Sequence, residues 1–286
     1  MSNFQIIDTH THFYDPSRPQ GVPWPSKDDD FLYRTVLPDE YKTMTTPLGV
    51  RGTVVVEASK WFEDNLWVLK LAETEPFIVG LVGNLQLDSV DFEPHFEQVT
   101  ANPLFRGVRL GGGVVQHLSD ADLQKLERLA AADLQLDVLG NADVMPRVAE
   151  LATQIPNLRI VIDHIGSARI DGKTPDREWA EAMQISAKPS NVYCKVSGLV
   201  EGVTDKMQPP PKDVDFYAPV LDLLWNQFGQ ERLIYGSNWP VSARYADYAF
   251  VQQLALDYFQ PKGQDVIVKV FEQNSKAVYK WIDRLK

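Results

Sequence analysis

The chain has 286 residues, of which 44% are hydrophobic and 23% are charged, so it is long and apolar enough to bury a sizeable core. Its formal net charge of -11 argues against a nucleic-acid or anionic-membrane partner, because either would need a basic patch. The single cysteine, Cys194, excludes an internal disulfide and fits a reducing compartment. No segment approaches the roughly 20 apolar residues of a membrane span, and the first residues lack a targeting pattern. We therefore predict a cytoplasmic protein with no nucleic-acid or membrane partner, in which Cys194 is a core residue.

The first predicted strand ends in two histidines that are two residues apart in the sequence. Because alternate side chains of an extended strand share a face, His10 and His12 are predicted to point the same way at its carboxyl end. Ile6 and Asp8 are expected on the same face. Taken alone, the pair is as consistent with surface residues of an exposed strand as with a functional site.

A long segment rich in proline and aromatic residues, 13–42, follows this strand. An ordered loop of this length is usually functional, so we predict that it forms a lid or wall of a site. Its residues Trp24 and Tyr33, like Trp239 much later in the chain, are as consistent with packing as with stacking on a sugar ring.

Beyond residue 42, apolar runs of strand length alternate with segments of helical spacing. The predicted strands are 53–57, 77–85, 105–110, 134–139, 158–164, 192–196 and 233–236. The predicted helices are 61–74, 92–99, 120–132, 144–154, 177–187, 215–228, 246–259 and 265–280, and residues 111–113 are expected to form a flexible turn.

This alternation predicts an α/β protein, a single-domain (β/α)8 barrel over residues 1–286. A doubly wound open sheet is the alternative. The absence of a G-x-G-x-x-G or phosphate-loop glycine pattern after the first strand weakens it.

Polar residues recur where the predicted strands end. Because the carboxyl ends of barrel strands meet at one mouth, residues far apart in the sequence can form one site there. These strand-end residues are His10, His12, Glu57, Arg109, His164, Lys195 and Asn238.

Strand alternation also predicts which way two of these residues point. On the sixth strand, His164 is predicted to share a face with Ile160 and Ile162, and on the eighth Asn238 is predicted to share a face with Gly236. His164 could be a core histidine, but its place between an apolar strand and a glycine favours a site residue.

Five short motifs occur in order along nearly the whole chain: I-D-T-H-T-H at 7–12, F-R-G-V-R at 105–109, V-I-D-H-I-G at 161–166, Y-C-K-V-S-G at 193–198 and Y-G-S-N-W-P-V at 235–241. Together they resemble the amidohydrolase superfamily. The resemblance is strongest to its lactonase branch, which contains fucono- and rhamnonolactonases and pyrone-dicarboxylate and sulfomuconolactone hydrolases. The proline and aromatic loop, with Trp24-Pro25 and Tyr33-Arg34, also resembles this branch.

The resemblance implies a (β/α)8 barrel that hydrolyses a lactone, whereas other branches decarboxylate an acid or open an amide. His10 and His12 match the first-strand histidine pair, His164 the sixth-strand histidine, and Asn238 the eighth-strand aspartate. In much of the superfamily the pair binds a divalent metal, so His10 and His12 are candidate ligands for one zinc or manganese ion, and a metal-free enzyme is equally open. Residues 140–141 lack a lysine or histidine, so a two-metal centre is not expected.

The charged strand-end residues each allow two interpretations. Glu57 could pair with Arg51 or Lys60 at the surface as readily as it could line a site. Arg109 and Lys195 would more often be solvated charges, but at strand ends in an acidic protein they are candidates to bind a carboxylate or a lactone carbonyl.

Asn238 departs from the family pattern, because a carboxylate can move a proton from water to a leaving oxygen and an amide cannot. The chain could therefore use another base, with His164 and Glu57 as candidates, or a metal-bound hydroxide. It could also be a sugar-acid binding protein that has lost turnover, including by deliberate substitution. A barrel decarboxylase of an aromatic or unsaturated acid is the other alternative.

We predict a hydrolase that opens a small sugar or dicarboxylate lactone. Water activated by a metal at His10 and His12, or by His164, would attack the carbonyl. The oxyanion would be stabilised by the metal, or by Lys195 or Arg109. A monomer or homodimer is expected.

Overall fold

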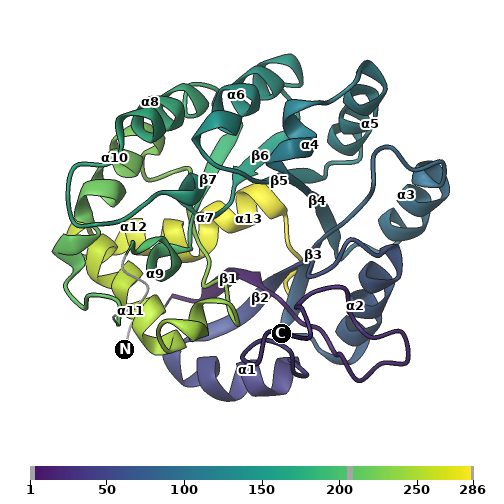
Figure 1. Ribbon diagram of the computed structural model, residues 1–286, viewed down its shortest axis with the longest axis horizontal. Helices are drawn as coiled ribbons and strands as arrows, with labels where there is room; N and C mark the ends of the chain where they lie inside the picture. The colour runs from purple at the N-terminus through teal and green to yellow at the C-terminus, as the bar shows by residue number, and fades with distance from the viewer. Residues whose placement is uncertain (1–3, 205–208, 285–286) are drawn as a thin grey trace.

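Eight parallel strands lie at the centre of the structure, and their order in the sheet is their order along the chain (Figure 1). The computed structural model describes residues 4–204 and 209–284. The strands are β1 (Ile6–Thr11), β2 (Val50–Val56), β3 (Ile78–Gly83), β4 (Phe105–Gly111), β5 (Gln135–Leu139), β6 (Arg159–Ile162), β7 (Val192–Val196) and β8 (Leu233–Tyr235). The first and last strands come together where Thr11 bridges Trp239 and the His12 N–H donates to the Trp239 carbonyl at 3.0 Å. The sheet is therefore a nearly closed barrel.

Helices surround this barrel and alternate with its strands (Figure 1). They are α1 (Pro38–Thr45), α2 (Phe62–Thr74), α3 (Phe92–Thr100), α4 (Gly112–Gln116), α5 (Asp120–Ala131), α6 (Met145–Gln154), α7 (His164–Ser167), α8 (Arg177–Ser186), α9 (Leu199–Gly202), α10 (Ala218–Phe228), α11 (Tyr248–Phe259), α12 (Gln264–Val268) and α13 (Asn274–Tyr279). The predicted single-domain (β/α)8 barrel is confirmed. In the part of the chain that the structure describes, no helix is long and apolar enough to cross a membrane.

Three local predictions are wrong. Helix α1 occupies the end of the predicted loop, and it begins with Pro38, a residue whose fixed φ suits the first turn of a helix. Helix α4 starts at Gly112, where a flexible turn was expected. The predicted helix 265–280 is divided by a π-helical turn, Lys269–Gln273. Directly after that turn, Asn274 donates to carbonyls next to β8, a contact that helical periodicity does not reveal.

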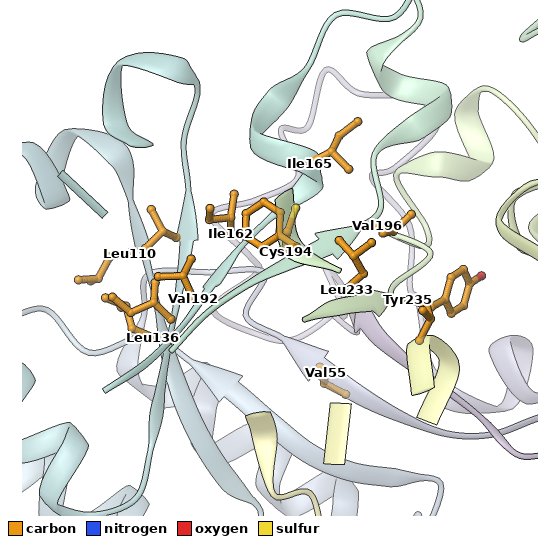
Figure 2. Packing of buried hydrophobic residues seen from close by; sticks show 14 of the residues in the cluster. Val55, Leu110, Leu136, Ile162, Ile165, Val192, Cys194, Val196, Leu233 and Tyr235 are labelled. Atoms are coloured by element: carbon orange, nitrogen blue, oxygen red, sulfur yellow. The ribbon is translucent and has the colours of Figure 1, made fainter. Parts of the chain in front are cut away.

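Two apolar layers hold the barrel together. The inner layer contains β-branched side chains that face the barrel axis, such as Val54, Val161 and Ile234. The outer layer lies between the strands and the helices, and Figure 2 shows members from neighbouring strands, among them Ile162 and Cys194. Cys194 is fully buried there, so its prediction as a core residue is confirmed. Continuous apolar runs are typical of strands buried on both faces.

The amino end of the barrel is closed by the last segment of the chain. Arg106 at the start of β4 donates to the Tyr279 carbonyl at 2.9 Å, and Arg159 at the start of β6 donates to the Val278 carbonyl at 2.7 Å. Trp281 packs into the inner apolar layer. Since this end is filled, the opposite end, where the strands terminate, is the mouth of the barrel.

Candidate active site

Strand β1 does not present its polar residues on one face, so that prediction is wrong. Asp8 points outward with Ile6, and its Oδ2 accepts a hydrogen bond from the Tyr41 hydroxyl of α1 at 2.7 Å. The pairing of β1 with β2 is irregular after Asp8. Beyond this irregularity His10 lies inside the barrel, with its Nδ1 3.1 Å from the ammonium of Lys195. An irregular strand changes which side chains share a face.

The alternation predicted for the sixth strand is also wrong. Ile160 and Ile162 pack in the outer apolar layer, and Asp163 points into the barrel. His164 reaches the mouth because the chain turns there. It has a φ of 50°, and its Nδ1 lies 2.8 Å from the Ser197 hydroxyl.

This turn, residues 164–167, is left-handed throughout, with φ between 49° and 61°. Such values cost roughly 1 kcal/mol or more for each residue other than glycine, so packing must hold the turn. The Trp179 indole donates to the Ile165 carbonyl at 3.0 Å. A Cβ at Gly166 would lie 2.7 Å from the sulfur of Met183. The strained turn therefore fixes His164 at the end of β6.

Directly after β8, Gly236 faces the interior, whereas Asn238 has a φ of 60° and is not placed by the alternation of an extended strand. A Cβ at Gly236 would lie 2.9 Å from the Cβ of His10 and 3.2 Å from the Cδ of Lys195. Glycine thus leaves the space in which these two side chains meet.

A group of charged side chains, the buried ion cluster, lies inside the barrel below the mouth. It consists of Lys195, Asp137, Asp163 and His10, all 0% exposed. The Lys195 ammonium lies 2.8 Å from Asp137 Oδ2, 2.8 Å from Asp163 Oδ1 and 3.1 Å from His10 Nδ1. Two carboxylates and an imidazole surround the ammonium, so its charge is paired inside the barrel. Lys195 is therefore not placed to contact a substrate, which corrects its prediction as a substrate clamp.

The pKa values in the buried ion cluster follow from burial and from these pairs. Burial opposes the charge of Lys195, but the two carboxylates outweigh it and raise its pKa. Burial raises the pKa of Asp137, and Lys195 only partly offsets this. For Asp163, Lys195 and His10 outweigh burial and lower the pKa well below the usual range. We conclude that Lys195 is charged and Asp163 ionised at neutral pH.

Sequence reasoning missed Asp137 and Asp163. The signal for Asp137 was present, because a carboxylate between Leu136 and Val138 in an apolar strand must find a buried partner. Asp163 directly precedes His164, and strand alternation predicts that two neighbouring side chains point in opposite directions. Because His164 was predicted to point inward, Asp163 was predicted to point outward.

The histidines of the site are neutral at neutral pH. Burial lowers the pKa of His12 to about 3, and that of His164 to about 4. Burial and the nearby Lys195 lower the pKa of His10 well below its usual range. The Nδ1 of His12 lies 3.0 Å from the Val56 carbonyl, so it carries the proton and leaves Nε2 as an acceptor.

Three residues could hold a divalent metal ion, and their chemistry fits one. His10, Asp163 and His164 each offer a ligand atom, and these atoms lie within 4.8 Å of one another. His10 Nε2 and Asp163 Oδ2 are buried without a hydrogen-bond partner among the described residues. A neutral imidazole and an ionised carboxylate are the forms that bind zinc. The prediction paired His10 with His12, but the structure groups His10 with Asp163 and His164.

At the mouth, Glu57 pairs with Arg109 and not with Arg51 or Lys60, so of the two interpretations the structure favours a residue that lines the site. The Nε of Arg109 donates to Glu57 Oε1 at 2.9 Å, and its Nη2 donates to the Glu57 carbonyl at 3.0 Å. Both side chains are 13% exposed. Burial raises the pKa of Glu57, although Arg109 partly offsets it.

Asn238, at the end of β8, is 6% exposed and donates from Nδ2 to Glu201 Oε1 at 2.8 Å. Glu201 belongs to the short helix α9, directly after β7. Sequence reasoning missed Glu201, because it lies beyond the predicted strand end. A glutamate in a turn after a barrel strand was the signal that could have found it.

Two cavities meet at the mouth, where both are lined by His164, Asn238 and Val241. The larger has a volume of about 770 Å³, a usual size for a small-molecule site. Its other lining residues are His12, Pro23, Trp24, Glu57, Ala58, Ser59, Lys60, Trp61, Asn84, Gln86, Arg109, Gly111 and Leu139. The smaller has about 490 Å³ and extends over α7 and α9.

Of the three aromatic residues predicted to contact substrate, one lies at the cavity and two do not. Trp24 lines the larger cavity, with its ring centre 5.6 Å from that of His12. Tyr33 is partly buried and lines neither of the two cavities at the mouth. Trp239 is 2% exposed and packs on Phe13 and Tyr41, so it is a core residue and its prediction as a substrate contact is wrong.

A parallel eight-stranded barrel with a cavity lined by histidine, charged and aromatic side chains at the carboxyl ends of its strands defines a (β/α)8-barrel enzyme. Within that class, the chain belongs to the amidohydrolase family, whose model matches residues 7–281.

The chain is similar to two curated relatives over most of its length. An L-fucono-1,5-lactonase of Burkholderia ambifaria is 32% identical over 292 residues, which cover 97% of this chain and 96% of the relative. An L-fucono-1,5-lactonase of Burkholderia multivorans is 28% identical, covering 87% of this chain and 86% of the relative. Among solved structures, an amidohydrolase from Burkholderia multivorans with bound zinc has a TM-score of 0.85 at 24% identity. The aligned region covers 97% of this chain and 99% of that structure.

Proposed function

We propose that this protein hydrolyses a small lactone, with L-fucono-1,5-lactone as the first substrate to test. The observation that carries the proposal is the 770 Å³ cavity, which brings His12, His164 and Asn238 to one space at the barrel mouth. The relative that is 32% identical over nearly its full length is an L-fucono-1,5-lactonase, which supports the same substrate class.

The cavity wall suits a sugar ring. Trp24 and Trp61 line it with aromatic surface, on which the apolar face of a sugar can pack. Asn84, Gln86 and Arg109 line it with hydrogen-bonding groups that can fix ring hydroxyls. Walls of both kinds hold a lactone carbonyl near His164 while limiting the access of bulk water.

His164 is proposed to contact the reacting atoms. Its imidazole is neutral at neutral pH and is oriented through its Nδ1 by the Ser197 hydroxyl. In the metal-free form it can therefore hydrogen bond the attacking water or the carbonyl oxygen. The buried ion cluster fixes the site from below, because Lys195 ties the strands that carry Asp137, Asp163 and His10.

We propose His10, Asp163 and His164 as the holders of one divalent ion, zinc or manganese. When bound, such an ion supplies Lewis-acid polarisation of the carbonyl and lowers the pKa of bound water. The bound zinc of the Burkholderia multivorans structure supports a metal in this fold.

The charge and composition support two further proposals. A net charge of -11 fits a protein without a nucleic-acid or anionic-membrane partner. We propose a cytoplasmic monomer or homodimer, which cell fractionation and size-exclusion chromatography with light scattering would test.

A non-catalytic sugar-acid binding protein is the second candidate, and the amide at Asn238 is the observation that favours it. The test is a pH-indicator assay over aldonolactones and unsaturated dicarboxylate lactones, with and without zinc or manganese, on the wild type and on Asn238→Asp. Acid release by the wild type supports the lactonase. Activity only in Asn238→Asp, with ligand-dependent thermal stabilisation of the wild type, supports the binding protein. Carbon dioxide release without acidification would indicate a decarboxylase.

A further inference from the structure

Beside the larger cavity at the mouth lies another, of about 690 Å³, which we call the side cavity. Its walls come mostly from residues 84–88, which follow β3, and from residues between 109 and 117, where β4 leads into α4. Strands β3 and β4 are neighbours in the barrel (Figure 1). The residues that line both cavities are Lys60, Asn84, Gln86, Arg109 and Gly111. The two cavities therefore adjoin along these residues.

The size of the side cavity suits a further part of a substrate. Small-molecule sites usually have roughly 300–1,000 Å³, so the larger cavity is by itself sufficient for a lactone ring. That ring does not need the side cavity, which lies in the same size range. A third cavity that also borders Asn84 has about 220 Å³, below this range. The side cavity is therefore the adjoining space that can bind another group of the same molecule.

Asn84 lies between the two cavities, and its backbone is fixed. The side chain of Asn65, which is 2% exposed, accepts from the Asn84 N–H at 2.9 Å and donates to the Asn84 carbonyl at 2.7 Å. A Cβ at Gly83 would lie 2.3 Å from Asn65 Oδ1, so only glycine allows this contact. The Oδ1 of Asn84 is buried and has no hydrogen-bond partner among the described residues. A hydroxyl of a ligand that spans the two cavities would supply the missing hydrogen bond.

Arg109 lies at the same boundary and offers hydrogen-bond donors. Its Nε and Nη2 donate to Glu57, which fixes the plane of the guanidinium. Its Nη1 lies 4.0 Å from Asp163 Oδ2, beyond hydrogen-bond distance, and makes no hydrogen bond with a described residue. Asn84 and Arg109 thus place an acceptor and a donor where the cavities adjoin. This combination suits hydroxyl groups, which both donate and accept.

The charges of the side cavity disfavour an acidic ligand. The charge of Arg109 is compensated by Glu57. The other lysine or arginine that lines the side cavity is Lys60, whereas Asp88 and Asp122 contribute two carboxylates. The remaining formal charge is therefore negative, which would repel a second carboxylate on the substrate. A neutral group fits better.

Neutral side chains of two kinds are also present in the side cavity. Gln86 offers an amide, and Val114, which is 47% exposed, offers an aliphatic surface on which a sugar ring can pack. We infer that the substrate is a disaccharide lactone, whose lactone ring occupies the larger cavity and whose second, neutral sugar ring occupies the side cavity. Asn84 and Arg109 bind hydroxyls where the two rings join. This inference rests on the proposed function and names its substrate class.

The first test compares lactones with one and two rings on the wild-type protein. Laminaribiono-, cellobiono- and gentiobiono-1,5-lactone are each compared with D-glucono-1,5-lactone, so that the second ring is attached at three different positions of the same lactone. The measurement is the initial rate of proton release above spontaneous hydrolysis. We expect kcat/KM for at least one disaccharide lactone to exceed that for D-glucono-1,5-lactone by about tenfold or more, because binding of a remote group lowers the barrier to reaction.

The second test obstructs the side cavity. Gly113 of α4 lines it, and a Cβ there would meet no atom within 4 Å, so a larger side chain can enter this space. In Gly113→Trp, kcat/KM should fall about tenfold or more for the preferred disaccharide lactone and stay within about twofold for D-glucono-1,5-lactone. Gln116, on the same helix, lines neither cavity, so Gln116→Trp is the matched control and should keep both values. Val114→Trp is a second obstructing variant, and thermal unfolding shows whether each protein is folded.

The outcomes distinguish this inference from the proposed function. If single-ring lactones are hydrolysed and no disaccharide lactone is preferred, the inference is overturned and the lactonase remains. A folded Gly113→Trp or Val114→Trp that keeps the full preference for the disaccharide lactone also overturns the inference. Inactivity of the wild type on every lactone, with one ring or two, overturns the proposed function instead.

Discussion

The interior and the mouth of this barrel both hold charged residues, but the charges exist in different physical settings. In the buried ion cluster, Lys195 and Asp137 are 0% exposed, and the ammonium is surrounded by Asp137, Asp163 and His10. At the mouth, Glu57 and Arg109 keep 13% of their side-chain surface exposed and line a cavity of 770 Å³. The charges inside the barrel thus stabilise the fold, whereas the charges at the ends of neighbouring strands are accessible to a substrate.

Removing the central cation should have the largest effect. In Lys195→Met, the carboxylates of Asp137 and Asp163 would remain buried next to each other without a cation. Loss of one partner of a buried ion pair costs about 3–5 kcal/mol of unfolding free energy. Urea denaturation followed by circular dichroism measures this, with Lys60→Met at the exposed rim as a control that should change stability by less than about 0.5 kcal/mol. Equal stability of the two variants would show that the interior charge does not stabilise the fold more than a charge at the mouth.

Loss of a mouth residue should instead affect catalysis. His164→Ala is expected to lower kcat roughly 100-fold or more, because the proposed function places the imidazole against the attacking water or the carbonyl. The loss of its contact with Ser197 should cost only about 1 kcal/mol of stability. Steady-state kinetics and thermal unfolding of the same preparation separate these effects. An unchanged rate would refute the role of His164.

Two tryptophans extend the comparison to apolar side chains. Trp239→Phe, in the aromatic core with Phe13 and Tyr41, is expected to cost about 2 kcal/mol of stability through the cavity it leaves. Its KM should stay near that of the wild type. Chemical denaturation gives the first quantity and lactone kinetics the second. A large rise in KM with normal stability would show that Trp239 contacts the substrate.

Trp24→Ala should change KM more than stability, which is the opposite of Trp239→Phe, and its effect should be smaller. The residue lines the cavity beside His12, so its loss should raise KM about tenfold through lost contact with the ring. The unfolding free energy should change less than in Trp239→Phe. Kinetics over a range of lactone concentrations measures the change, and an unaltered KM would show that this wall does not contact substrate.

The sequence predicted the barrel because strand and helix periods alternate along it, and each period is a local property. It also predicted that His10, His12, His164 and Asn238 lie near one another, since carboxyl ends of barrel strands converge. His12, His164 and Asn238 line one cavity, whereas His10 is buried below it. Residues that mark the ends of strands are therefore accessible to reasoning from the chain alone.

Contacts across the barrel were not accessible in this way. Glu57 pairs with Arg109, which is 52 positions away, and no local pattern distinguishes that partner from Arg51. The direction of His164 depends on a left-handed turn held by Trp179, and strand alternation cannot foresee a change of hand. Glu201 was missed for a related reason, because its place beside Asn238 arises only when β7 and β8 pair.

The most direct test of the account is the initial rate of proton release from L-fucono-1,5-lactone, measured against spontaneous hydrolysis at the same pH. We expect a saturable acceleration by the wild-type protein. The same measurement on other sugar and dicarboxylate lactones extends it if that substrate is poor. Rates no faster than spontaneous hydrolysis for every lactone, from a folded protein that is stabilised by sugar acids, would contradict the lactonase and leave a binding protein.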